Sequence, residues 1–390
     1  MVNRLKYPTD PAELARRHKI TLEAMEKEGV DVLITAAYDR VFAGVARYLT
    51  DVTVPIYAMQ FMFCKEGAII FGHGGEGGHA IPPTVKYPNI LEDYSIPYLP
   101  SITFRDSWYA EKMAEVIRRH GFKKAGWVGL SYIPASTYKY LQEALPDVEF
   151  VNFTDQMDRI KAVKSPWEIN ELKKVVKLHD DILCAVPTVL RVGRTEKEVA
   201  DDIRHISFSM DCPEVNIMVG TNPLIPRGSG PYIYAHETIK KGDYFTLLVE
   251  VPAPSGLWAE IIATYCMGDP SPLAVKAHAD AVEVRDALAA RMVPGADPAV
   301  LKEFVNGLYV EKGYFREKRF GTHGQGYDIV DRPVLEHGET IMLEENMYFA
   351  LHSSCVNDQI SGIICENYLV AEGGAIRMSR LPAQINVIEY

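Results

Sequence analysis

Hydrophobic and polar residues follow two different patterns along the first 150 residues of the chain. Short apolar runs rich in β-branched and aromatic side chains predict strands. Longer amphipathic stretches, each ending at a glycine, predict helices. The predicted strands cover residues 31–37, 67–72, 124–130 and 148–153, and the predicted helices cover residues 11–29 and 105–121. Alternating strands and helices indicate an α/β domain.

The pattern changes near residue 158, where two helices with strong start signals begin. Ser165 can cap the first helix, and Pro166 fits its first position. Glu168, three residues after the serine, completes a capping box. Thr195 and Glu198 repeat the same spacing. We therefore expect the second half of the chain to open with two helices.

The last 150 residues are dominated by predicted strands with a helix pair between them. The strands cover residues 243–251, 259–268, 339–352 and 362–372, and the helices cover residues 272–292 and 297–313. A chain of 390 residues is long enough for two domains. We predict an α/β domain over residues 1–157. Residues 158–390 should form an α+β domain with an antiparallel sheet and helices on one face.

Composition indicates which binding partners and which cellular compartment to expect for the protein. The formal net charge of −11 disfavours nucleic acid and anionic membranes as partners, since both attract basic surfaces. The six cysteines form no CxxC pair and mostly lie in apolar runs, which is typical of reduced, buried thiols. The first residues are polar, and no apolar run approaches the roughly 20 residues that span a bilayer. We expect a soluble cytoplasmic protein.

Polar residues at unexpected places in apolar strands are the candidates for chemistry. They are Glu250, Glu260, His352 and Glu366, together with His323 in a glycine-rich stretch. A carboxylate in such a run is costly unless it is paired or coordinates an ion. Each residue alone is more often solvated or structural, but together they predict one shared site on a sheet face. At that site His323 would be a metal ligand, a proton carrier or an ordinary turn residue.

Several residues near these positions in sequence are candidates for substrate binding. Arg227 lies in a glycine-rich segment and could clamp a substrate carboxylate. The aromatic candidates are Trp258, Tyr327 and Tyr232, for which ordinary packing is the alternative.

An ordered set of motifs carries a resemblance to a known family. The motifs are VARYLTDV (45–52), RIKAVKSPWEINELKKV (159–175), RVGRTEKEVADDI (191–203), IKKGDYFTLL (239–248), GLWAEIIATYCMG (256–268), GTHGQGYDIVDRP (321–333) and GIICENYLVAEGG (362–374). Together they resemble the pita-bread family of prolidase, aminopeptidase P, methionine aminopeptidase and creatinase. The resemblance covers nearly the whole chain. It implies a creatinase/prolidase-type N-terminal domain and a pita-bread catalytic domain.

The resemblance also implies a set of site residues. In the metallopeptidases of this family, Asp, Asp, His, Glu and Glu hold two divalent ions. The first Asp falls on Val249, with the neighbouring Glu250 as the alternative. The other four ligands fall, in order, on Glu260, His323, His352 and Glu366.

The chain departs from the family pattern at several of these positions. A second His that many members carry falls on Val330, and an upstream His falls on Pro231, with His236 the nearest histidine. Replacing a bridging carboxylate by His352 removes an anion that a two-metal site needs. We therefore expect no dinuclear centre. No cofactor is favoured, and one iron, manganese or zinc ion is the alternative.

The leading hypothesis is a hydrolase of a C–N bond, amide or amidine, in a small molecule, as in the metal-free relative creatinase. His323 would carry protons, with His352 beside it, and Glu260 or Glu366 would orient it or hold a cationic group. The first alternative is a mononuclear metal hydrolase or lyase with ligands drawn from these residues and Glu250. The second is an inactive binding module. The resemblance also implies a homodimer, with residues 54–61 of one subunit helping to close the site of its partner.

Overall fold

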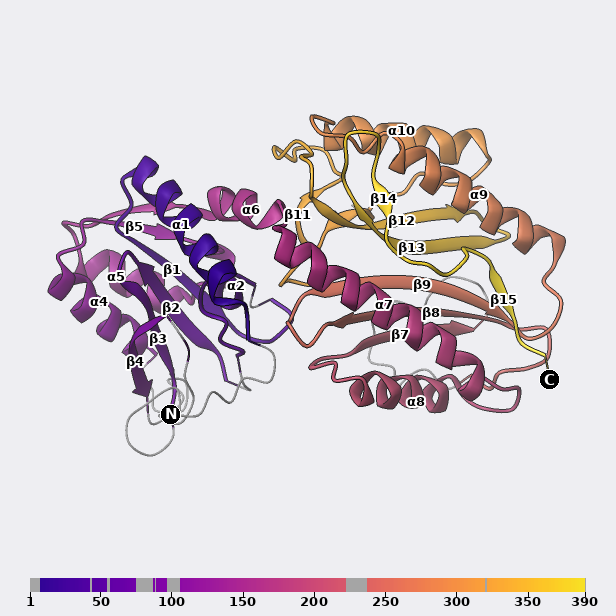
Figure 1. Cartoon of the computed structure of the whole chain (residues 1–390), viewed down its shortest axis with the longest axis horizontal. Helices are drawn as coiled ribbons and strands as arrows, with labels where there is room; N and C mark the ends of the chain where they lie inside the picture. The colour runs from indigo at the N-terminus through magenta and orange to yellow at the C-terminus, as the bar shows by residue number, and fades with distance from the viewer. Residues whose placement is uncertain are drawn as a thin grey trace. The chain divides into compact units, whose positions relative to one another are not determined.

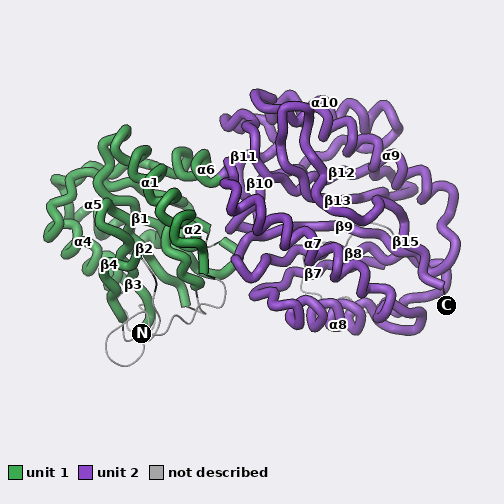
Figure 2. The backbone as a smooth tube through the Cα atoms, viewed as in Figure 1, with its two compact units in different colours: residues 1–161 green, residues 162–390 purple. Residues whose placement is uncertain are grey.

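The computed structural model describes residues 8–42, 44–54, 57–74, 87, 89–96, 106–221, 237–319 and 321–389. The chain divides into two compact units, residues 1–161 and residues 162–390 (Figure 2). Within the described part of the chain, no helix combines the length and the apolar character needed to cross a bilayer.

The first unit is an α/β domain built on a six-stranded mixed sheet with the order β4-β3-β2-β1-β5-β6. Its elements are α1 (Pro11–Glu28), β1 (Val32–Ala37), α2 (Gly44–Thr50), β2 (Met59–Cys64), β3 (Gly67–His73), β4 (Ile90–Ile96), α4 (Trp108–His120), β5 (Lys124–Trp127), a 3₁₀ turn (Leu130–Tyr132), α5 (Ala135–Ala144), β6 (Glu149–Asn152) and α6 (Thr154–Ala162). β1 pairs in parallel with β5 and antiparallel with β2. Helices α4 and α5 pack on the apolar strands to form its main core.

The second unit is built on a nine-stranded sheet that is antiparallel along its main path. Its helices are α7 (Pro166–Val189), α8 (Glu196–Ser209), α9 (Pro272–Ala289) and α10 (Pro298–Glu311). Its strands are β7 (Asn216–Thr221), β8 (Tyr244–Pro252), β9 (Trp258–Cys266), β10 (His323–Gly324), β11 (Asp331–Val334), β12 (Tyr348–Val356), β13 (Ser361–Leu369), β14 (Ile376–Arg377) and β15 (Ile385–Val387). The strand order is β11-β10-β12-β13-β9-β8-β7, with β14 on β13 and β15 on β9.

The four helices of the second unit lie on one face of this sheet, called the helix face below (Figure 1). Helices α7 and α8 pack on β7, β8 and β9, where Val249 and Ile261 belong to one buried cluster. Helices α9 and α10 pack on β12 and β13, where Leu351 and Ile364 belong to another. Side chains alternate between the faces of a strand, so their sequence neighbours point to the opposite face.

The predicted starts of α7 and α8 are confirmed in atomic detail. The Ser165 hydroxyl accepts the Glu168 amide proton (3.1 Å), and the Glu168 carboxylate accepts the Ser165 amide proton (2.9 Å). Thr195 and Glu198 form the same reciprocal pair. Each pair satisfies two backbone donors that a helix start leaves without intrahelical partners.

The predicted strand over residues 339–352 differs most from the structure. β12 begins at Tyr348 rather than near residue 339, and it continues to Val356. Glu339, at the start of the predicted strand, instead accepts hydrogen bonds from Arg332 and from the Val334 and Ile341 amides. This carboxylate organises a turn, so an extended strand cannot start there. His352 consequently lies in the middle of β12.

Candidate functional site

The strand register brings the polar candidates of β8, β9, β10 and β12 to one face of the second sheet. Glu250 of β8 lies directly opposite Glu260 of β9. His323 of β10 lies opposite Ala350, which shares a strand face with His352 two residues further on. This face is opposite to the helix face and is called the polar face below. Val249 points to the helix face, so Glu250 is the residue that faces Glu260.

Glu260 is buried between two imidazoles. Its Oε2 atom lies 3.2 Å from Nε2 of His352 and 3.5 Å from Nε2 of His323. The two rings are 5.4 Å apart between centroids. Burial raises the pKa of Glu260, but the charges and hydrogen bonds of His352 and His323 outweigh it and lower that pKa. The carboxylate is therefore ionised and is shared by both histidines.

The backbone fixes the tautomer of His323. Its Nδ1 atom lies 2.8 Å from the carbonyl oxygen of Gly324. A carbonyl oxygen can only accept a hydrogen bond, so Nδ1 carries the proton. Nε2 is then the nitrogen that can gain or lose a proton. Nε2 and the Glu260 carboxylate oxygen face each other as two acceptors unless a cation lies between them. The arrangement therefore suits a proton or a metal ion at this point.

The main chain of β9 is held in place beside Glu260 by Asn367. The Asn367 amide donates to the Glu260 carbonyl (2.9 Å) and accepts from the Glu260 amide (3.2 Å). Tyr348 donates to the same Asn367 oxygen (2.7 Å). These contacts fix the backbone position from which the Glu260 side chain projects.

Glu250 has different hydrogen-bond partners from Glu260. Asn216 donates to its Oε2 atom (2.9 Å), and Gln325 donates to its Oε1 atom (3.0 Å). Burial, together with the nearby Glu260 charge, raises the pKa of Glu250 well above its usual value. Burial and the neighbouring charge therefore favour the neutral form of Glu250 beside the ionised Glu260. Both of its oxygens already have amide partners.

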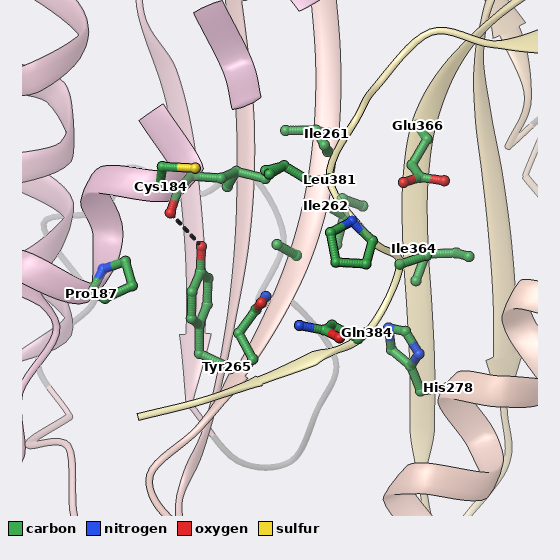
Figure 3. A pocket seen from close by; sticks show the side chains of 15 residues that line it. Cys184, Pro187, Ile261, Ile262, Tyr265, His278, Ile364, Glu366, Leu381 and Gln384 are labelled. Atoms are coloured by element: carbon green, nitrogen blue, oxygen red, sulfur yellow. Dashed lines mark hydrogen bonds between the residues drawn. The ribbon is translucent and has the colours of Figure 1, made fainter. Parts of the chain in front are cut away.

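Glu366 does not join this group. It is the sequence neighbour of Cys365, which pairs with His352 across β12 and β13, so Glu366 points to the helix face. There it forms ion pairs with Arg285 of α9 and with Arg377 of β14. It lines a cavity of about 280 Å³ on that side, together with His278 (Figure 3). The predicted convergence therefore includes Glu260, His323 and His352 but not Glu366.

Cys365 of β13 also reaches the polar face, opposite His352, and it is not among the residues predicted from sequence. Ligand atoms of Glu260, His352 and Cys365 all lie within 4.8 Å of one another. Cys365 is completely buried, and burial raises the pKa of its thiol well above the usual value. The alternation of side chains between the two faces of β13 is the sequence signal that could have identified Cys365. That signal is ambiguous without the register against β12.

The structure describes two of the four predicted substrate-binding residues, Trp258 and Tyr327. Trp258 is fully buried and lies two residues before Glu260 on β9, and Tyr327 is also buried. Arg227, Tyr232 and His236 lie outside the described residues. The roles of all these residues stay predictions.

Comparison with known families identifies the chain. Residues 170–373 match the model of Metallopeptidase family M24, and residues 17–163 match the Creatinase/Prolidase N-terminal domain. The first match alone spans more than half of the chain. The chain belongs to metallopeptidase family M24. The pita-bread fold of the second unit and the α/β fold of the first, both predicted from sequence, are thereby confirmed. M24 is a family of hydrolases that cleave C–N peptide bonds, and its name implies use of divalent metal.

Individual relatives are distant from this M24 member. It is 24% identical to a probable dipeptidase PepE of Mycobacterium bovis over 60% of the chain, and the aligned part spans 63% of that dipeptidase. It is 20% identical to an Xaa-Pro dipeptidase of Pyrococcus horikoshii, covering 94% of the chain and 97% of the relative. The crystal structure of an X-Pro aminopeptidase from Thermotoga maritima superposes with a TM-score of 0.81 at 16% identity, covering 95% and 99% of the two chains.

The residues present do not fit the two-ion site that the family resemblance implied. Two divalent ions need several bridging carboxylates to hold and neutralise them. Here the polar face carries His352 at one such position, and Glu250 has both oxygens bound by amides. Glu366 is neutralised by two arginines on the other face. Of the predicted carboxylate ligands, all of which lie in the described part of the chain, Glu260 alone is left for an ion, so we derive no step that uses two metals.

Proposed function

We propose that this M24 member hydrolyses a C–N bond, in an amide or amidine of a small molecule, without a pair of metal ions. The observation that supports this proposal is the position of Glu260, whose single carboxylate oxygen lies within 3.5 Å of two imidazole nitrogens. Hydrolysis needs a group that takes a proton from water and returns it to the leaving nitrogen. The Glu260, His323 and His352 group supplies such carriers beside a fixed negative charge.

The tautomer of His323 suggests how the proton moves. Nδ1 donates to the Gly324 carbonyl, so Nε2, which faces Glu260, is the nitrogen that accepts a proton from water as the water oxygen bonds to the substrate carbon. Glu260 stabilises the imidazolium that forms. The proton then passes from an imidazole to the departing nitrogen as the C–N bond breaks. In this scheme Glu260 is the orienting carboxylate, and Glu366 has no part in the proton transfer.

The substrate class follows from the family and from the charge of the site. Dipeptides are the first candidates, because relatives carry the names dipeptidase and Xaa-Pro dipeptidase. Small cationic amides and amidines are the second class, since a lone buried carboxylate favours a positive group. A lyase would break its bond by elimination, giving an unsaturated product without incorporating water, and a non-catalytic binding role would leave the C–N bond intact.

The test is release of amine from a panel of dipeptides, cationic amides and amidines by the purified full chain. We expect His323→Ala and Glu260→Gln to lower kcat/KM by about 10²–10⁴-fold, which is the usual contribution of a positioned proton carrier. Glu303→Gln, at an exposed ion pair, is the charge-matched control and should keep full activity. Undiminished hydrolysis by Glu260→Gln, or activity that requires two ions per chain, would contradict the proposal.

We also propose that the protein works as a homodimer in the cytoplasm. The six cysteines are free thiols, which suits a reducing compartment. Residues 54–61, which the resemblance assigns to the partner's site, include the start of β2 at Met59. A monomeric mass by light scattering at working concentration would contradict the dimer.

A further inference from the structure

We propose that the cavity on the helix face of the second sheet binds a small neutral molecule with an apolar body and one hydroxyl group. Glu366 and His278 line this cavity, whereas the group proposed to do the chemistry lies on the polar face. The cavity is therefore a separate site, and the inference depends on neither the substrate nor the reaction.

The cavity lies where β9 exchanges one partner strand for another. β9 pairs with β13 at Ile262 and with β15 from Thr264 onwards. Helix α7 packs on β9, and α9 packs on β13, so the cavity lies between the two helices. Its volume of about 280 Å³ is roughly the share of nine waters in the liquid. One small organic molecule would fill it.

Most of the residues that line the cavity are apolar. They include Leu183 and Pro187 of α7, Ile261 of β9, Ile364 of β13 and Leu381 near the end of the chain. An apolar lining with a few polar groups is typical of small-molecule sites. The apolar body of a ligand would be stabilised there, because both the ligand and the lining lose contact with water.

His278 of α9 gives the cavity a polar group without a partner. This residue is 7% exposed, and its ring points into the cavity (Figure 3). Within the described part of the chain, neither nitrogen of the ring has a hydrogen-bond partner. Burial, followed by the charge of Arg285, lowers the pKa of His278 against the opposing charge of Glu366. A neutral imidazole offers one donor and one acceptor, and a hydroxyl group can serve either.

The charged groups beside the cavity favour a neutral ligand. Glu366 pairs with both Arg285 and Arg377, and Asp286 accepts a further hydrogen bond from Arg285 (2.7 Å). Each guanidinium group therefore already has a carboxylate partner. A charged ligand would have to give up water without gaining an unpaired counter-ion, which is costly.

Cys184 of α7 provides a reporter for the cavity. It lines the cavity and is exposed, whereas the other five cysteines, all in the described part of the chain, are buried. A thiol-specific reagent should therefore react first at Cys184 in the folded protein. A ligand in the cavity should slow that reaction.

The experiment titrates the full chain with benzyl alcohol, toluene, benzoate and benzylammonium, which share one ring and differ in the polar group. Calorimetry measures affinity, and the alkylation rate of Cys184 reports the location. We expect benzyl alcohol to bind once per chain, with a dissociation constant on the order of 1 mM, and to slow alkylation. Toluene should bind about three- to tenfold more weakly, which is the usual contribution of one hydrogen bond. The two charged probes should bind at least about tenfold more weakly.

Two substitutions at His278 test the recognition of the hydroxyl group. His278→Leu should weaken benzyl alcohol to the level of toluene and leave toluene binding nearly unchanged. His278→Gln keeps a side chain that can donate and accept, so it should restore most of the difference. His205→Leu, at an exposed position of α8, is the matched control and should leave the binding of all four probes unchanged.

Three outcomes would overturn the inference. The first is a wild-type protein that shows no saturable binding of benzyl alcohol, or binding that leaves the alkylation of Cys184 unchanged. The second is tighter binding of benzoate or benzylammonium, because the occupant would then be charged. The third is an equal loss of benzyl alcohol and toluene binding in His278→Leu, because the imidazole would then shape the cavity without recognising the hydroxyl group.

Discussion

The buried His179 links the stability of the second unit to the pH of the solution. It is fully buried in α7, where Nδ1 donates to the Val175 carbonyl and Nε2 accepts from the Val251 amide (3.4 Å). This pair of contacts requires the neutral ring. Burial lowers the pKa of His179 below its usual value. The unfolded chain therefore binds a proton near pH 6.5 that the folded chain does not.

The pH dependence that follows has a definite sign. The contribution of His179 to stability is complete above its unfolded pKa of about 6.5 and is lost as the pH falls towards the folded value. The wild-type protein should lose up to about 1.4 kcal/mol per pH unit from this group below pH 6. His179→Gln should flatten that slope, whereas the exposed His205→Gln should not. Denaturant unfolding between pH 5 and pH 8 measures the difference, and equal slopes in both variants would refute the assignment.

Glu366, predicted as a site residue, lies on the helix face, and its ion pairs there support a role in stability. Its carboxylate neutralises Arg285, whose side chain is only 6% exposed, and also Arg377. Glu366→Gln would leave the buried Arg285 guanidinium paired with Asp286, whose side chain is 60% exposed, and should cost up to about 3–5 kcal/mol. Arg377→Gln should cost less, since that side chain is 26% exposed. Thermal unfolding of the two variants measures which substitution lowers stability more. A fully stable Glu366→Gln that loses proton-transfer chemistry would return Glu366 to the site.

At the scale of elements, sequence patterns located the main strands and helices but could not choose the face of β13. The capping boxes are local, so Ser165 and Thr195 predicted the starts of α7 and α8 correctly. The polar residues of β9 and β12 also reached one face as expected. In β13, however, Cys365 and Glu366 are neighbours, and a shift of one residue in register exchanges their faces. That register depends on pairing with β12, which the sequence of β13 alone does not contain.

The packing of α9 on β13 depends on one glycine. A Cβ atom at Gly362 would clash with the backbone carbonyl oxygen of Ala277 in α9. Such a contact is with backbone rather than a flexible side chain, so Gly362→Ala must displace α9 and should cost at least about 3 kcal/mol. Gly307 in α10 has open space around its Cβ position. Gly307→Ala should therefore be neutral or stabilise by up to about 1 kcal/mol. Equal stability of the two variants in urea would contradict this view of the interface.

At the scale of the whole molecule, each unit has a hydrophobic core made of its own residues, so we expect two unfolding transitions. Phe71 is completely buried in the core of the first unit, and Phe349 in that of the second. Truncating either one to alanine should cost about 3–5 kcal/mol. In units of this size, that cost lowers the melting temperature by on the order of 10 °C.

Scanning calorimetry of the full chain distinguishes independent unfolding of the two units from a single cooperative transition. The paired variants make the same chemical change in different cores. Phe71→Ala should lower one transition and leave the other in place, and Phe349→Ala should do the reverse. If both variants lower a single common transition by the same amount, the two units unfold as one cooperative body. Stability of the polar face would then depend on the first unit as well. If the transitions separate, loss of activity in Phe349→Ala alone assigns the chemistry to the second unit, where Glu260, His323 and His352 lie.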